Sequence, residues 1–142
     1  IQLHFGLSRA SDLAAGNTAA ARALIRYLAG DDTLEVPSPT FTLLQSYDLP
    51  PFPVVHADLY RINDPEELNE IGLFPPPDNA VALIEWPERV PNALPENRID
   101  IALSHDPASD ADARVAEITG YGKGGAQVAR PKALRGLLER AG

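Results

Sequence analysis

The most informative feature of the sequence is a glutamate at the end of an apolar run. Glu85 follows Ala80–Ile84, a segment without a single polar side chain. A continuous apolar run of this kind is typical of a strand that is buried on both faces of a sheet. A carboxylate that follows an apolar run is often a helix cap or a solvated loop residue. Nucleotide-binding α/β folds, however, hold a metal ion with a carboxylate at the carboxyl end of such a strand. Glu85 is therefore a candidate metal-side acid.

Composition restricts the class of protein. With 142 residues and 44% hydrophobic residues, the chain is long enough for one globular domain. The net charge of -8 repels phosphate backbones, so we expect no direct DNA binding and no independent RNA binding. The sequence has no cysteine and three histidines, which argues against thiolate chemistry and zinc but leaves a hard metal bound by oxygen. Without an apolar stretch near the roughly 20 residues of a membrane span, or a signal peptide at Ile1–His4, we expect a cytoplasmic protein.

Strand and helix signals alternate through the first half of the chain. Apolar residues recur at helical spacing over Thr18–Leu28, and Gly30 follows as a terminator, so we predict a helix there. Thr40–Tyr47 and Val54–Tyr60 are rich in β-branched and aromatic residues and flank a proline-rich bend, which predicts a strand hairpin. Asp64–Glu67 combines an N-cap aspartate, an early proline and a glutamate, and therefore predicts a short capped helix.

The second half of the chain supplies the remaining strands. We expect Ala80–Glu85 to be central, whereas the alternating pattern of Ile99–Leu103 and the short segment Arg114–Thr119 predict half-exposed strands towards one edge. Gly120–Gly125 is interpreted as a glycine-rich linker, and Pro131–Ala141 as an amphipathic helix. The fold class that follows is α/β, with a mixed sheet flanked by helices.

Four motifs follow one another along the chain: Pro37–Thr42, His56–Arg61, Asp64–Gly72 and Leu83–Arg89. Together, in this order and spacing, they resemble the signature of the bacterial TsaE (YjeE) family. The resemblance implies a single P-loop NTPase-like domain that binds ATP with Mg²⁺. It further implies partner-stimulated ATP hydrolysis, with TsaB and TsaD, in the threonylcarbamoyladenosine modification of tRNA. The tRNA would then be handled mainly by the assembly, in agreement with the acidic charge.

The sequence departs from the family at the P-loop. The family pattern is Gly-Asp-Leu-Gly-Ala-Gly-Lys-Thr, whose backbone N–H groups cradle phosphates while the lysine contacts the β and γ phosphates. The corresponding residues here, Ser11–Thr18, read Ser-Asp-Leu-Ala-Ala-Gly-Asn-Thr, without two of the glycines and without the lysine. Asn17 cannot supply the cationic charge, so this alignment predicts badly weakened nucleotide binding and hydrolysis.

A second alignment places the loop outside the printed sequence. Ile1–Ala14 then resembles the family's amino-terminal strand and helix start, which normally precede the loop. In this interpretation residues are missing between 13 and 18, because no apolar strand precedes Ser11 to hold a phosphate loop. We accordingly expect a domain at 1–122 with an internal gap, and a linker with a C-terminal amphipathic helix at 123–142.

The resemblance also implies a role for each matching residue. Asp58 orients the attacking water or holds the metal, and Glu85 acts on Mg²⁺ directly or through water. Because neighbouring strand ends and the start of a helix meet at one edge, we expect Thr18, the Mg²⁺-binding hydroxyl, to converge with both carboxylates. Each residue has a structural alternative, such as capping, β-propensity or aromatic packing. The residues expected to contact the nucleotide are Gly16, Asn17, Thr18, Thr40, Thr42, Trp86 and Arg114.

Two other functions remain open beside the accessory ATPase. One is a structural or interaction subunit that has lost nucleotide binding through a degenerate P-loop, for which Asn17 is the support. The other is a P-loop small-molecule kinase, which requires an acceptor site that the sequence does not reveal. Nucleotide binding separates the first alternative from the ATPase, and dependence of hydrolysis on TsaB and TsaD separates the second.

Overall fold

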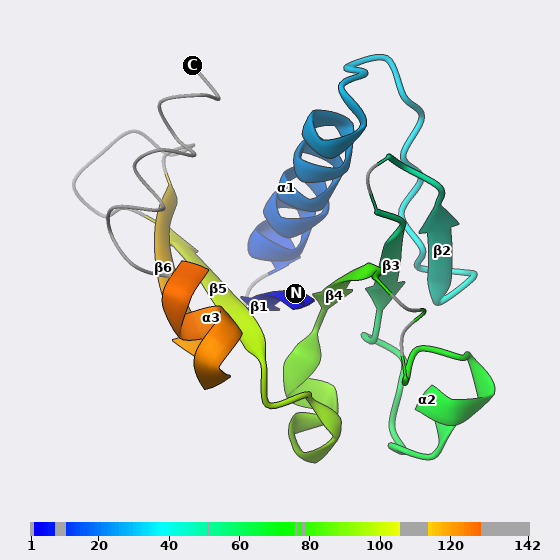
Figure 1. Cartoon of the computed structure of the whole chain (residues 1–142), viewed down its shortest axis with the longest axis vertical. Coiled ribbons are helices and arrows are strands. Elements are labelled where there is room, and N and C mark those ends of the chain that lie inside the picture. Colours follow the sequence, from blue (N-terminus) through cyan, green and yellow to red (C-terminus); the bar gives the residue numbers. More distant parts are fainter. Residues whose placement is uncertain are drawn as a thin grey trace.

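A mixed sheet of six strands forms the centre of the computed structural model, which describes residues 2–7, 11–50, 52–75, 77, 79–105 and 114–128 (Figure 1). Within those residues, no helix combines the length and the apolar character that crossing a bilayer requires. The elements are β1 (Gln2–Leu7), α1 (Ser11–Ala29), β2 (Leu44–Tyr47), β3 (Val54–Asp58), α2 (Glu67–Glu70), β4 (Val81–Glu85), the 3-10 turns η1 (Pro87–Arg89) and η2 (Pro91–Ala93), β5 (Arg98–His105), β6 (Arg114–Tyr121) and α3 (Gly122–Val128).

The strand order is β2-β3-β4-β1-β5-β6. The four inner strands run parallel, and β2 and β6 pair antiparallel at the two edges. The predicted central position of the strand that ends at Glu85 is confirmed, because β4 lies between β3 and β1. The predicted placement of β5 and β6 towards one edge is confirmed as well. An apolar run suits an inner strand because helices cover both of its faces.

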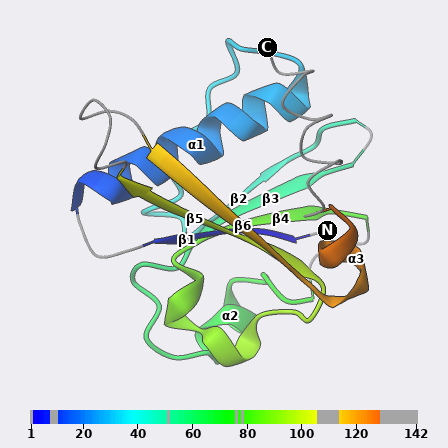
Figure 2. The same ribbon diagram turned by 90° about the vertical axis from the view of Figure 1, so that its left-hand side faces the viewer.

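Helices cover the two faces of the sheet (Figure 2). On one face, Ala21 and Ile25 of α1 pack in a cluster with Val54 of β3 and Leu83 of β4. On the other face, alternate residues such as Ala57 and Ile84 pack with α2 and the turns around it. Because side chains alternate along a strand, His56, Asp58 and Glu85 lie on the α1 face. The α/β fold with a mixed sheet flanked by helices is as expected.

Local signals in the first half are largely confirmed. The hairpin of β2 and β3 forms, although β2 begins only at Leu44, after a turn in which Leu43 has a φ of 62°. The reciprocal cap before α2 also forms: Asp64 N donates to Glu67 Oε1 at 2.9 Å, and Glu66 N donates to Asp64 Oδ1 at 2.9 Å. Gly72 follows with a φ of 71°, a backbone conformation that favours glycine.

The premise that no apolar strand precedes Ser11 to hold a loop does not stand, because β1 precedes it, where the second alignment expected the amino-terminal strand. β1 lies inside the sheet, in parallel register with β4 and β5. Its alternating sequence hides this position, because Gln2 and His4 interrupt what would otherwise read as a buried run. The helix predicted from Thr18 begins earlier, at Ser11, so residues 11–18 are helical. The proposed gap between 13 and 18 stays a prediction.

The predicted glycine-rich linker is also wrong. β6 continues to Tyr121, and α3 occupies residues 122–128. A Cβ on Gly125 would lie 2.1 Å from the carbonyl oxygen of Arg98, and a Cβ on Gly120 would lie 2.2 Å from that of Gly125. These glycines therefore allow close packing of α3 against the sheet rather than chain flexibility. The helix predicted at Pro131–Ala141 lies outside the described residues.

Candidate functional site

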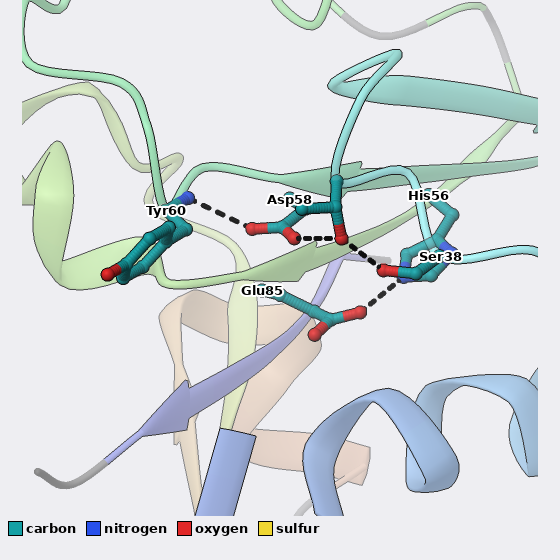
Figure 3. Close-up of polar contacts among 6 residues, drawn as sticks. Ser38, His56, Asp58, Tyr60 and Glu85 are labelled. Atoms are coloured by element: carbon teal, nitrogen blue, oxygen red, sulfur yellow. Dashed lines mark hydrogen bonds and ion pairs between the residues drawn. The ribbon is translucent and has the colours of Figure 1, made fainter. Parts of the chain in front are cut away.

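The structure brings two of the predicted site residues together. Asp58 and Glu85 are the last residues of β3 and β4 and are direct register partners. Neighbouring strands lie about 4.8 Å apart, and both side chains lie on the α1 face. Figure 3 shows the two carboxylates side by side at the strand ends. Both residues are buried, at 6% and 1% exposure, so the fold removes two acidic groups from bulk water at one point.

Asp58 organises the turn that leaves β3. Its Oδ1 accepts the backbone N–H of Tyr60 at 2.9 Å, and its Oδ2 accepts the hydroxyl of Thr40 at 3.3 Å. The Thr40 hydroxyl in turn lies 2.6 Å from that of Ser38. A short chain of hydroxyl groups thus links the segment before β2 to the carboxylate. Asp58 has a structural role in this turn, which is compatible with a chemical role.

Glu85 contacts a residue that sequence reasoning did not include among the site residues. Its Oε1 lies 2.7 Å from Nε2 of His56, and both side chains are buried (Figure 3). His56 precedes Asp58 by two residues on β3, so both side chains lie on one face of the sheet. That spacing within a strand is the signal by which His56 could have been found. Its contact partner could not be read from the sequence.

The other residues of the first motif differ in their placement. Thr40 is half-buried and its hydroxyl donates to Asp58, whereas Thr42 is exposed. The nucleotide contacts predicted for both threonines remain predictions. The guanidinium of Arg61 donates to the carbonyl oxygens of Thr40 and Phe41. Arg61 therefore stabilises the segment before β2 through the backbone of that segment. Among the described residues, it makes no hydrogen bond to Asp58 or Glu85.

Trp86 and Arg114 lie away from the paired carboxylates. Trp86 has a φ of 59°, and its ring packs against the cluster on the α2 face. The ring also contacts that of Tyr60 in a tilted arrangement, with centroids 5.0 Å apart and planes at 57°. Arg114 begins β6, three strands away from β4 in the sheet. The predicted nucleotide contacts of both residues remain predictions.

Gly16, Asn17 and Thr18 lie inside α1, which begins at Ser11. Only the first four N–H groups of a helix are free of intrahelical bonds, so the backbone of these three residues is not arranged to cradle a phosphate. Their side chains are outside the description of the structure. Convergence of Thr18 with Asp58 and Glu85 therefore remains a prediction.

The donor atoms at the strand ends are compatible with Mg²⁺. Carboxylate and hydroxyl oxygens are the ligands that a hard cation prefers, and Mg²⁺ usually combines one or two carboxylates with phosphate oxygens and water. In the described ranges, no three His, Cys, Asp or Glu side chains are close enough to hold a metal by themselves. The described residues at the strand ends therefore fit a metal that arrives with phosphate oxygens.

One surface groove in the described part of the chain lies elsewhere. It has a volume of about 520 Å³ and runs between η1, η2 and the strands β5 and β6. Neither Asp58 nor Glu85 lines it. The even-numbered residues of β5 that do line it lie on the α2 face, opposite the carboxylates. This groove is therefore separate from the candidate site, which rests on the chemistry of its side chains.

Comparison with known proteins agrees with the motifs. The family model described as "Threonylcarbamoyl adenosine biosynthesis protein TsaE" matches residues 7–114. A tRNA threonylcarbamoyladenosine biosynthesis protein TsaE from Rickettsia bellii is 41% identical over 108 residues, which cover 76% of this chain and 72% of that protein. The protein of the same name from Haemophilus influenzae is 37% identical over 101 residues, which cover 70% of this chain and 61% of that protein. The match to the protein of the same name from Rickettsia conorii covers 52% of that protein's length, or about half.

A solved structure shares the fold. The crystal structure of YdiB from Bacillus subtilis superposes with a TM-score of 0.64, at 22% identity, over 99% of this chain and 78% of that one. At this identity the likeness concerns the fold alone. It extends to the part of the chain that carries α1, β3 and β4.

Proposed function

The chain belongs to the TsaE family, and from that membership we propose that it binds and hydrolyses ATP as an accessory protein in the threonylcarbamoyladenosine modification of tRNA, acting with TsaB and TsaD. The observation that carries the proposal is the pairing of Asp58 and Glu85 at adjacent strand ends. Parallel α/β folds place their ligands at this edge of the sheet. The acidic chain leaves tRNA contact mainly to the partners.

Each residue at the strand ends has a definite task in this proposal. Glu85 holds Mg²⁺ directly or through water, and Asp58 orients the attacking water or shares the metal. Mg²⁺ bound with ATP supplies positive charge that offsets the charge on the transferred phosphoryl group. Burial of both carboxylates strengthens their interaction with a cation, because the dielectric there is lower than in water. Thr40 connects the preceding segment to Asp58 through its hydroxyl.

A second candidate function has an observation in its favour. α1 is continuous from Ser11 to Ala29, and Asn17 stands where the family carries lysine. A helical backbone and a neutral side chain both weaken a phosphate site. The second candidate is thus a structural subunit that has lost nucleotide binding. For a small-molecule kinase no acceptor site stands out among the described residues, and we do not develop that alternative.

Equilibrium binding of Mg²⁺–ATP to the unmodified protein separates the two candidates. The accessory ATPase predicts saturable binding, and hydrolysis that requires TsaB and TsaD. The structural subunit predicts no binding, and a gain of binding in the triple variant Ser11→Gly, Ala14→Gly, Asn17→Lys, which restores the family pattern. Asn69→Lys is the matched control, because it adds the same charge at an exposed position on α2. Binding in the control would attribute the gain to charge alone.

The missing-residue interpretation requires a separate test. Trypsin cleaves after Arg9 and Arg22, and so yields the peptide 10–22 if the chain is continuous as printed. Detection of that peptide by mass spectrometry would exclude a gap between 13 and 18. A longer peptide containing a lysine and additional glycines would establish a P-loop there, and would remove the argument for a degenerate site.

A further inference from the structure

His56 and Glu85 form a buried polar pair on the α1 face. The two atoms in contact, Nε2 and Oε1, are 2.7 Å apart, and the side chains are 0% and 2% exposed. The register partner of His56 on β4 is Leu83, two residues before Glu85. The contact between the imidazole and the carboxylate is therefore diagonal across the two strands.

The surroundings give this contact its significance. Val54 and Leu83 occupy the same face of the same two strands and pack against α1, so the local environment is apolar. A buried imidazole and a buried carboxylate are costly unless they satisfy each other. Nδ1 of His56 has no hydrogen-bond partner in the described part of the chain. Within the described residues, the contact with Glu85 is thus the only hydrogen bond of the His56 ring.

The direction of the hydrogen bond follows from the chemistry of the groups. A carboxylate can only accept, so the ring hydrogen lies on Nε2 and is donated to Oε1 of Glu85. The bond restricts the rotation of a side chain that would otherwise sample several rotamers. One oxygen of Glu85 is thereby fixed before any ligand arrives. Asp58, the neighbouring carboxylate, is fixed by different donors, from Tyr60 and Thr40.

We propose that His56 is a positioning residue that holds the Glu85 carboxylate in place for the metal-bearing nucleotide. The inference rests on the proposed function, because it assigns His56 to the same site. A residue that only filled space at position 56 would need no polar atom, as Val54 shows. Partners that orient a metal-side carboxylate typically contribute about 10- to 100-fold in metal affinity or activity. His56 is expected to contribute within that range.

The test measures the Mg²⁺ concentration that half-saturates the protein at saturating ATP. Isothermal titration calorimetry follows this binding directly and does not require hydrolysis. His56→Leu should raise the half-saturating concentration about 10-fold or more. His56→Gln, which keeps a donor within reach, should restore most of the loss. Val54→Ala is the matched control: it lowers stability on the same face of the same strand but should leave the Mg²⁺ response unchanged.

A double variant distinguishes positioning from packing. If His56 acts through Glu85, His56→Leu combined with Glu85→Gln should respond to Mg²⁺ as Glu85→Gln alone does. Additive effects, or a wild-type response in His56→Leu, would overturn the inference and leave the proposed function standing. If His56→Leu does not fold, His56→Asn serves instead, because its shorter amide does not reach Glu85.

A nucleotide-free measurement keeps the two proposals distinguishable. The Nε2–H proton of His56 should appear in the NMR spectrum of the free protein as an exchange-protected resonance that disappears in Glu85→Leu. Absence of that resonance in the wild type would overturn the positioning role by itself. A wild type that shows the resonance but no response to Mg²⁺–ATP would overturn the proposed function and, with it, the positioning role.

Discussion

Glu85→Gln separates the charge of this residue from its shape. The substitution keeps the length of the side chain and an oxygen that can still accept from His56 Nε2 at the end of β4. A hydrogen bond to a charged group is worth about 1 kcal/mol more than a neutral one, so the stability should fall by about that amount. For a domain of this size, a loss of about 1 kcal/mol lowers the melting temperature by about 3 to 4 °C. The fold should therefore survive.

The effect on hydrolysis should be much larger. Glu85 is buried beside Asp58, and its charge is the part of the site that attracts a cation. If the weakened metal site raises the barrier by about 3 kcal/mol, the rate falls roughly 100-fold, because each 1.36 kcal/mol changes a rate about tenfold. ATP itself should still bind, because its base and sugar do not depend on this carboxylate.

The assay is phosphate release with TsaB and TsaD present, together with thermal denaturation of each variant. Glu88→Gln is the matched control, because it removes one negative charge from the exposed turn just beyond the strand. Turnover at the wild-type rate in Glu85→Gln would show that Glu85 is a bystander. A melting temperature lowered by more than about 10 °C would instead attribute any loss of rate to unfolding.

Three further substitutions test other parts of the structure. Asp58→Asn should lower the rate of hydrolysis, measured as phosphate release, about 100-fold, because it removes the negative charge. ATP binding should be retained, because the asparagine keeps an acceptor oxygen in the turn. An unchanged rate would contradict the role of Asp58. Gly125→Ala should lower the melting temperature by several degrees, because its Cβ would lie 2.1 Å from the carbonyl oxygen of Arg98; Gly124→Ala, whose nearest neighbour is 3.9 Å away, should not. Burial raises the pKa of Tyr47 above its ordinary value of 10.0, so the folded protein keeps the phenolic proton longer than the unfolded chain does. The free energy of unfolding should therefore fall as the pH rises above about 10, and Tyr47→Phe should reduce that fall in urea denaturation; identical pH dependence in both proteins would exclude this cause.

The sequence by itself determined the features that depend on neighbours along the chain. The apolar run before Glu85 predicted an inner strand, because only a strand covered on both faces can bury every side chain. The cap at Asp64 and Glu67 was predictable because both partners lie within one helical turn. The ordered motifs indicated the family, and the position of Asp58 at the end of its strand indicated a candidate site residue.

Only the tertiary structure decided which residues meet across the sheet. His56 and Glu85 are 29 positions apart, and their contact depends on the register of β3 against β4. The inner position of β1 depends on its pairing with β4 and β5, which its own alternating sequence does not reveal. Gly125 looked like part of a flexible linker because the carbonyl that it must approach belongs to a different element. Such features follow from long-range packing, in which many weak contacts together select one register, and no single segment of the chain contains that information.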